Sequence, residues 1–134
     1  MSQENVELVR RSFEAHRAGG IEASLAFYAD DLIWEAAPGW VEDRIYRGHD
    51  GVRKLDAIFL ESFEDYVLEL HELRAVGDRV LALFEATGSI KDSGAPIRQP
   101  IGIVLSGFRD GKIGEVRSFF GWQEARDAPD DQLR

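Results

Sequence analysis

At 134 residues, with 44% hydrophobic and 31% charged residues, the chain has the size and balance of one globular domain, which excludes a disordered or fibrous chain. Its net charge of -9 repels phosphate backbones and anionic lipids, so we expect neither nucleic acid nor membrane as a partner. The chain has no cysteine, which excludes disulfides, thiol catalysis and thiolate metal sites and agrees with a cytoplasmic location.

The first part of the chain predicts two helices and a short strand. Residues 5–18 predict an amphipathic helix, because apolar residues and His16 recur at helical spacing on one face. Gly19 and Gly20 are expected to end this helix. A second short helix is expected at 21–29, and a strand at 32–36 that Pro38 and Gly39 end.

The rest of the chain predicts one more helix and a long meander. Residues 39–48 are expected to form a loop anchored by Trp40 and Tyr46, after which Asp50 caps a helix that runs to about residue 63. Four strands are expected at 66–76, 79–90, 97–108 and 113–123. This order predicts a single α+β domain over residues 1–134, with helices on one face of one sheet and a tail that frays from about residue 127.

Three local motifs carry a resemblance to a known family. They are FYADD at 27–31, YRGHDGV at 46–52 and RDGKI at 109–113. In this order, over nearly the whole chain, they resemble the nuclear transport factor 2-like superfamily and in particular its SnoaL-like members. The resemblance implies a cone-shaped roll, in which a strongly curved, mainly antiparallel sheet and about three helices enclose a pocket. It also implies a homodimer formed through the outer face of the sheet.

Two catalytic sets that the superfamily uses are not matched here. Ketosteroid isomerases use a base, an acid and a tyrosine, and the corresponding positions resemble Ala36, Ile103 and Ser12. Limonene-type epoxide hydrolases use an Asp-Arg-Asp set, and the corresponding positions resemble Phe84, Ala86 and Ser118. The resemblance therefore implies the pocket without implying either reaction.

The residues at these positions predict an apolar pocket with almost no ionisable groups. The resemblance implies that Trp34, Ala36, Phe84 and Ala86 belong to the ligand-binding wall, and strand alternation from Ser118 adds Phe120. Trp40 is a candidate lid over its mouth. The inward face of 97–108 stays open; if its even-numbered residues point inward, Arg98 meets an anionic or carbonyl group of the ligand. No metal site and no cofactor is expected, because the three histidines lie far apart in the sequence.

His16 and Ser118 are the candidate catalytic residues. His16 is either a general base on the pocket wall or a hydrogen-bonded core histidine, and both interpretations stay open. Two functions stay open as well. The first is a homodimer that binds a small apolar or aromatic molecule, with or without isomerase, cyclase or lyase activity. The second is a non-catalytic dimerisation or protein-interaction module whose outward apolar face comprises Leu81, Leu83, Ile101, Ile103 and Leu105.

Overall fold

The computed structural model describes residues 2–38 and 43–129. Its helices are α1 (Ser2–Ser24), α2 (Gly48–Ser62) and α3 (Trp122–Arg126), and a 3₁₀ turn η1 (Leu25–Phe27) follows α1. Its strands are β1 (Tyr28–Glu35), β2 (Ile45–Arg47), β3 (Phe63–Val76), β4 (Arg79–Ile90), β5 (Pro96–Ser106) and β6 (Ile113–Phe120). None of the helices in these ranges is long and apolar enough to cross a membrane.

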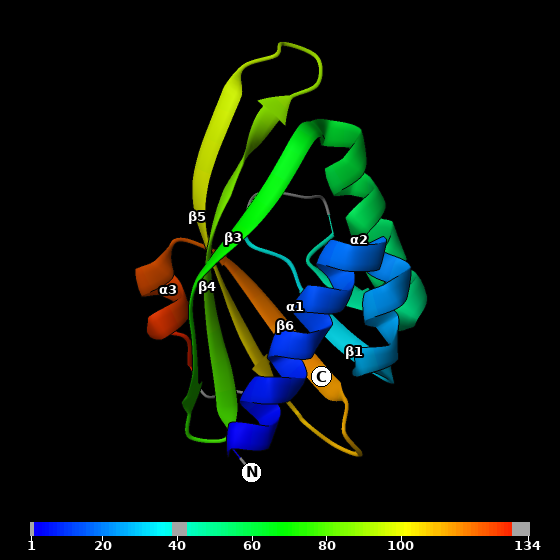
Figure 1. Ribbon diagram of the computed structural model, residues 1–134, viewed down its shortest axis with the longest axis vertical. Helices are drawn as coiled ribbons and strands as arrows, with labels where there is room; N and C mark the ends of the chain where they lie inside the picture. The colour runs from blue at the N-terminus through cyan, green and yellow to red at the C-terminus, as the bar shows by residue number, and fades with distance from the viewer. Residues whose placement is uncertain (1, 39–42, 130–134) are drawn as a thin grey trace.

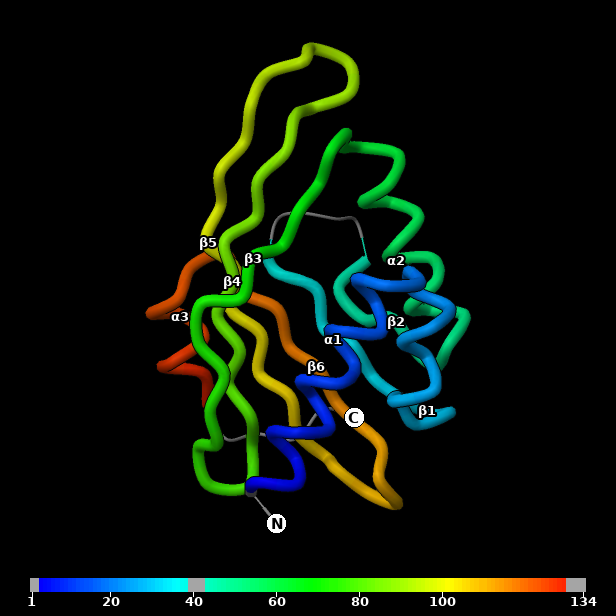
Figure 2. The backbone as a smooth tube through the Cα atoms, viewed as in Figure 1, coloured from blue at the N-terminus to red at the C-terminus, as the bar shows by residue number. Residues whose placement is uncertain are grey.

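The strands form one curved sheet in the order β2-β1-β6-β5-β4-β3. Neighbouring strands are antiparallel except for β1 and β6, which run parallel. Helices α1 and α2 cover one face of the sheet and α3 lies on the other (Figure 1). The tube in Figure 2 follows the β4-β5 hairpin beyond the helices at one end of the molecule. The expected α+β roll with a mainly antiparallel sheet is confirmed.

The sheet has an apolar core on each face. The inner face, under α1 and α2, buries among others Val9, Leu32, Val80, Ile113 and Val116. The outer face buries a smaller cluster in which Ala125 and Ala128 cover Leu81, Leu83 and Val104.

This arrangement contradicts the apolar interface that strand alternation suggested. Leu81 and Leu83 do point outward, but α3 covers them and Leu83 is only 1% exposed. Ile101, Ile103 and Leu105 belong to the inner core. The five residues therefore form no exposed surface.

The N-terminal elements differ from their expected bounds. The backbone leaves helical geometry at Gly20 (φ 77°, ψ -166°), where the first helix was expected to end, and a second helical stretch of α1 then runs to Ser24. The expected second helix at 21–29 is present as this stretch and η1, but it ends at Phe27, because Tyr28 and Ala29 are buried and already belong to β1. Tyr28 favours a strand, where its aromatic ring packs into the core.

The segment before α2 contains a strand that the sequence did not indicate. Residues 45–47 pair with β1 as β2, and Tyr46 is buried there. Helix α2 then begins at Gly48 after Arg47, which makes no capping bond through its side chain. The expected cap at Asp50 is wrong, because its carboxylate accepts a hydrogen bond of 2.7 Å from Arg53 within the first turn.

The C-terminal residues turn back over the outer face of the sheet. The expected strand at 113–123 ends at Phe120, because Gly121 (φ 127°) redirects the chain into α3. Helix α3 packs closely on β5, where a Cβ at Gly102 would lie 2.2 Å from that of Ala125. In this tail Arg79 donates a hydrogen bond to the Ala128 carbonyl and Arg117 donates one to the Pro129 carbonyl. Residues 130–134 lie outside the described ranges.

Candidate functional site

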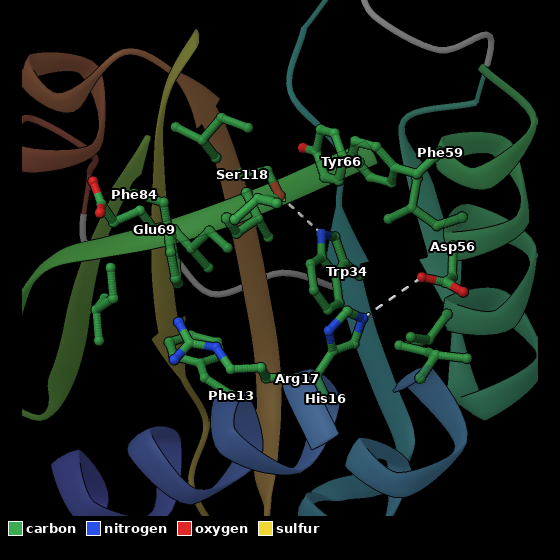
Figure 3. Close-up of a pocket in the computed structure, with 18 of the residues that line it drawn as sticks. Phe13, His16, Arg17, Trp34, Asp56, Phe59, Tyr66, Glu69, Phe84 and Ser118 are labelled. Carbon is green, nitrogen blue, oxygen red and sulfur yellow. Dashed lines mark hydrogen bonds and ion pairs between the residues drawn. The ribbon is translucent and has the colours of Figure 1, made fainter. Parts of the chain in front are cut away.

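A cavity of about 760 Å³ lies between the inner face of the sheet and helices α1 and α2. Aromatic and aliphatic side chains make up most of its wall (Figure 3), among them Phe13, Trp34, Phe59, Tyr66, Leu68, Phe84, Ile101 and Ile103. The curvature of β3 to β6 forms one wall, while the apolar faces of α1 and α2 form the other. A cavity of this size and lining has the character of a small-molecule site.

One polar pair lies on the sheet side of the cavity. The Trp34 indole nitrogen donates a hydrogen bond of 2.8 Å to Ser118 Oγ, which joins the parallel strands β1 and β6 (Figure 3). Because the serine oxygen accepts this bond, its own proton is available to a further acceptor. Among the residues that the structure describes, none accepts that proton.

A second polar pair lies on the helix side. His16 Nε2 of α1 is 3.7 Å from Asp56 Oδ1 of α2, and the side chains are 43% and 20% exposed (Figure 3). The two residues form an ion pair only when the imidazole is protonated. Sequence reasoning missed Asp56, although it lies on the apolar stripe of α2 between Val52 and Phe59, where a carboxylate is unusual.

Aromatic rings gather where α2 passes into β3. The Tyr66 ring lies 5.4 Å from the rings of both Phe59 and Phe63, measured between centroids. Burial raises the pKa of the Tyr66 hydroxyl to about 12, so this group stays protonated at neutral pH. Deeper in the wall, the Tyr28 ring packs edge-on against Trp34, and burial raises the pKa of Tyr28 as well.

Charged residues lie at the border of the cavity. The exposed ones are Arg10, Glu14 and Arg17 of α1 together with Asp65 and Glu69 of β3. The prediction that the pocket has almost no ionisable groups is therefore wrong at its border, where α1 and the edge strand β3 supply charged side chains. His16 and Asp56 lie in the half-buried part of the wall, together with the Tyr66 hydroxyl.

The structure brings most of the predicted site residues to this cavity. Six of them line it, namely His16, Trp34, Ala36, Phe84, Ser118 and Phe120. Ala86 is buried in the adjoining core and is not part of the lining. Trp40 lies outside the described residues.

Arg98 does not face the cavity, so its expected contact with a ligand is wrong. On β5 the inward residues are Ile101 and Ile103, so the even-numbered positions point to the outer face. The Arg98 side chain is 70% exposed and donates a hydrogen bond of 2.6 Å to Glu85. The open question of the β5 face is thereby answered against Arg98.

The same outer face holds a group of potential metal-binding atoms. Donor atoms of Glu69, His71 and Glu85 lie within 4.8 Å of one another. His71 Nε2 is 3.2 Å from Glu69 Oε1, and the Glu85 carboxylate is already paired with the Arg98 guanidinium. This arrangement is a charge network on the sheet that adjoins the border of the cavity through Glu69.

Comparisons with known proteins support the fold. The family model described as a SnoaL-like domain matches residues 9–116. A nuclear transport factor 2-like protein from Burkholderia xenovorans is 27% identical, with a TM-score of 0.75 over 94% of this chain and 95% of that chain. A similar protein of unknown function from Burkholderia pseudomallei is 23% identical, with a TM-score of 0.78 over 92% and 95% of the two chains.

A third similar structure is described as a putative SnoaL-like polyketide cyclase from Jannaschia. It is 19% identical, with a TM-score of 0.76 over 96% of this chain and 95% of that chain. No curated protein matches this sequence. At these identities the structural likeness establishes the fold and leaves the chemistry to the residues of the cavity.

Proposed function

This chain belongs to the SnoaL-like domain family, and we propose that it binds a small apolar or aromatic molecule in the cavity under α1 and α2. The observation that carries the proposal is the cavity itself, which is about 760 Å³ in volume and walled mainly by apolar side chains. Removal of apolar ligand surface from water contributes roughly 25 cal/mol per Å², so a ligand of a few rings gains enough to bind in such a space.

A neutral fluorescent probe and one cavity-filling variant test this proposal. N-phenyl-naphthylamine is expected to brighten on binding to the native protein. Leu68→Trp fills part of the cavity from β3 and is expected to weaken binding about tenfold or more. Val76→Trp is the control, because Val76 is on the same strand, is exposed and does not line the cavity. Equal affinity in both variants would rule the cavity out as the binding site.

The proposed reaction is proton transfer next to a carbonyl group, the step that isomerases, cyclases and lyases share. In this proposal, the Ser118 hydroxyl, whose oxygen accepts the Trp34 bond, donates a hydrogen bond to the ligand oxygen and stabilises the negative charge that develops there. His16 takes the proton from the adjacent carbon, since an imidazole serves as a base near neutral pH. Both side chains line the same cavity from opposite walls, which supports these two roles.

Deuterium exchange tests the reaction without knowledge of the natural substrate. The bicyclic ketone tetralone in heavy water is expected to exchange its protons next to the carbonyl faster when the protein is added. His16→Gln and Ser118→Ala are expected to lower this exchange by about tenfold or more. His71→Gln is the matched control, because His71 lies outside the cavity. If His16→Gln exchanges at the native rate, His16 has no catalytic role.

The expected homodimer and cytoplasmic location remain predictions. Because α3 covers Leu81 and Leu83, a dimer through the outer face would use the polar remainder of that face, around Glu85 and Arg98. Sedimentation velocity of the native chain and of Arg98→Glu measures this directly. A monomer at all concentrations would refute the homodimer.

A further inference from the structure

Asp56 is a carboxylate that the described part of the chain leaves without a hydrogen bond. Its side chain is 20% exposed and lines the cavity from α2. Its nearest recorded partner is His16 Nε2, and their separation of 3.7 Å is beyond hydrogen-bond reach. A largely buried carboxylate is unfavourable unless a cation or a donor satisfies it. Because no fully buried side-chain oxygen of the described residues lacks a partner, the Asp56 oxygens are open to the solvent of the cavity, where they present a negative charge to whatever occupies it.

The basic residues of the same helix pair with other acids. Arg53 donates to Glu22 and to Asp50 at 2.7 Å in each case. Lys54 Nζ lies 3.5 Å from Asp43 Oδ2. Neither cation of α2 is therefore committed to Asp56.

The other charges around the cavity do not compensate for Asp56. Among the described lining residues there are three further acids, Glu14, Asp65 and Glu69, and two arginines, Arg10 and Arg17. Arg10 is paired with Glu7, with a separation of 3.2 Å. The Arg17 side chain points away from Asp56, and His16 lies between the two (Figure 3). Since the whole chain carries a net charge of -9, the potential in the cavity favours a cation over an anion.

The apolar lining suits a cation as well as a neutral ring. Trp34, Phe59 and Tyr66 all line the cavity that Asp56 enters. The face of an aromatic ring attracts an ammonium group, most strongly where water is partly excluded. A ligand that is both apolar and positively charged thus meets complementary groups in one space.

Resting on the small-molecule binding proposed above, we propose that the ligand is a small aromatic or alicyclic amine whose protonated nitrogen pairs with Asp56. Its ring system lies against the aromatic lining, and its nitrogen points toward α2. The ammonium group gives the Asp56 carboxylate a hydrogen-bond donor, whereas the described residues offer it an ion pair with His16 that requires a protonated imidazole. It also assigns the cavity a preference against carboxylates and other anions.

Three probes of one shape test the charge preference by titration calorimetry: naphthylmethylamine, which is protonated at neutral pH, neutral naphthylmethanol and anionic naphthoate. The amine is expected to bind about tenfold more tightly than the alcohol, and this advantage shrinks as salt is added. Asp56→Asn keeps the shape of the side chain and is expected to remove the advantage while leaving the affinity for the alcohol unchanged. Glu61→Gln removes the same charge from α2 outside the cavity and is expected to change nothing.

The outcomes separate this inference from the function on which it depends. If none of the three probes binds, the cavity is not a small-molecule site and both proposals fail. If the alcohol binds as tightly as the amine, or Asp56→Asn leaves the amine unaffected, the apolar site stands and the amine assignment is overturned. Preferred binding of naphthoate that is lost in Arg17→Gln overturns it in favour of an anion site. Unchanged affinity of the alcohol for Asp56→Asn verifies that this variant is folded.

Discussion

The indole nitrogen of Trp34 donates a hydrogen bond of 2.8 Å to Ser118 Oγ and thereby connects the parallel strands β1 and β6. The bond satisfies an N–H group that would otherwise face an apolar cavity, and it holds the indole beside Tyr28. Trp34 and Ser118 are distant in sequence, and the parallel pairing of their strands brings them together.

We predict that Ser118→Ala lowers the free energy of unfolding by about 1 kcal/mol, because the Trp34 N–H loses its acceptor. Ser118→Thr keeps a hydroxyl and is expected to lose less. Chemical denaturation measures the stability, and the Trp34 indole N–H resonance in an NMR spectrum reports the bond. A Ser118→Ala protein with an unshifted indole resonance would show that the bond does not form in solution.

The sequence predicts the long strands well because their signals are local. Alternation and turn residues define β4, and the dipeptide Gly77-Asp78 marks its hairpin with β3. By contrast, β2 has only three residues and forms because β1 lies beside it. Helix α3 is equally hidden, since its place depends on the close contact between Gly102 and Ala125. Such elements depend on distant partners, which no local pattern contains.

The same difference between local signals and distant contacts decides which residues of the cavity could be predicted. Trp34, Phe84 and Ser118 could be placed on its wall because they lie on regular strands. The inward face of β5 could not be predicted, because a shift of one residue in register decides whether Arg98 or Ile101 points toward the cavity. Asp56 was missed since its relationship to His16 arises only when α1 and α2 pack together.

The contact between β5 and α3 predicts that a methyl group at Gly102 is not tolerated. Gly102→Ala would place its Cβ 2.2 Å from that of Ala125, so α3 must move away from Leu81 and Leu83. We expect a loss of about 1–3 kcal/mol in the free energy of unfolding. The double variant Gly102→Ala with Ala125→Gly is expected to recover part of this loss in thermal denaturation. No recovery would show that the contact with α3 is not the cause.

Burial under α3 predicts that Leu83→Glu prevents folding. The substitution puts a carboxylate at a site that is 1% exposed, in a cluster of apolar side chains. An unpaired charge there is expected to cost about 3–5 kcal/mol or more. Leu60→Glu, at a position that is 61% exposed on α2, is the control and is expected to stay folded. Circular dichroism shows whether each variant is folded. A Leu83→Glu protein that stays folded would contradict the finding that α3 covers Leu83.

The buried tyrosines predict how stability changes at alkaline pH. Burial raises the pKa of Tyr66 from 10.0 to about 12, so the folded state retains the phenol proton where the unfolded state has lost it. The contribution of Tyr66 is therefore fully present below pH 10.0 and is lost as the pH rises toward about 12. Tyr28 acts in the same direction, since its pKa is raised by burial too.

We therefore expect Tyr66→Phe to lose less stability than the native protein between about pH 8 and about pH 11, because phenylalanine has no proton to release. Urea denaturation at a series of pH values gives the free energy of unfolding for both proteins. Comparison at the lower pH corrects for any change in packing against Phe59 and Phe63, since both proteins have the same protonation there. Parallel pH profiles of the two proteins would mean that the Tyr66 hydroxyl is freely hydrated, and that the aromatic corner where α2 passes into β3 is open to water.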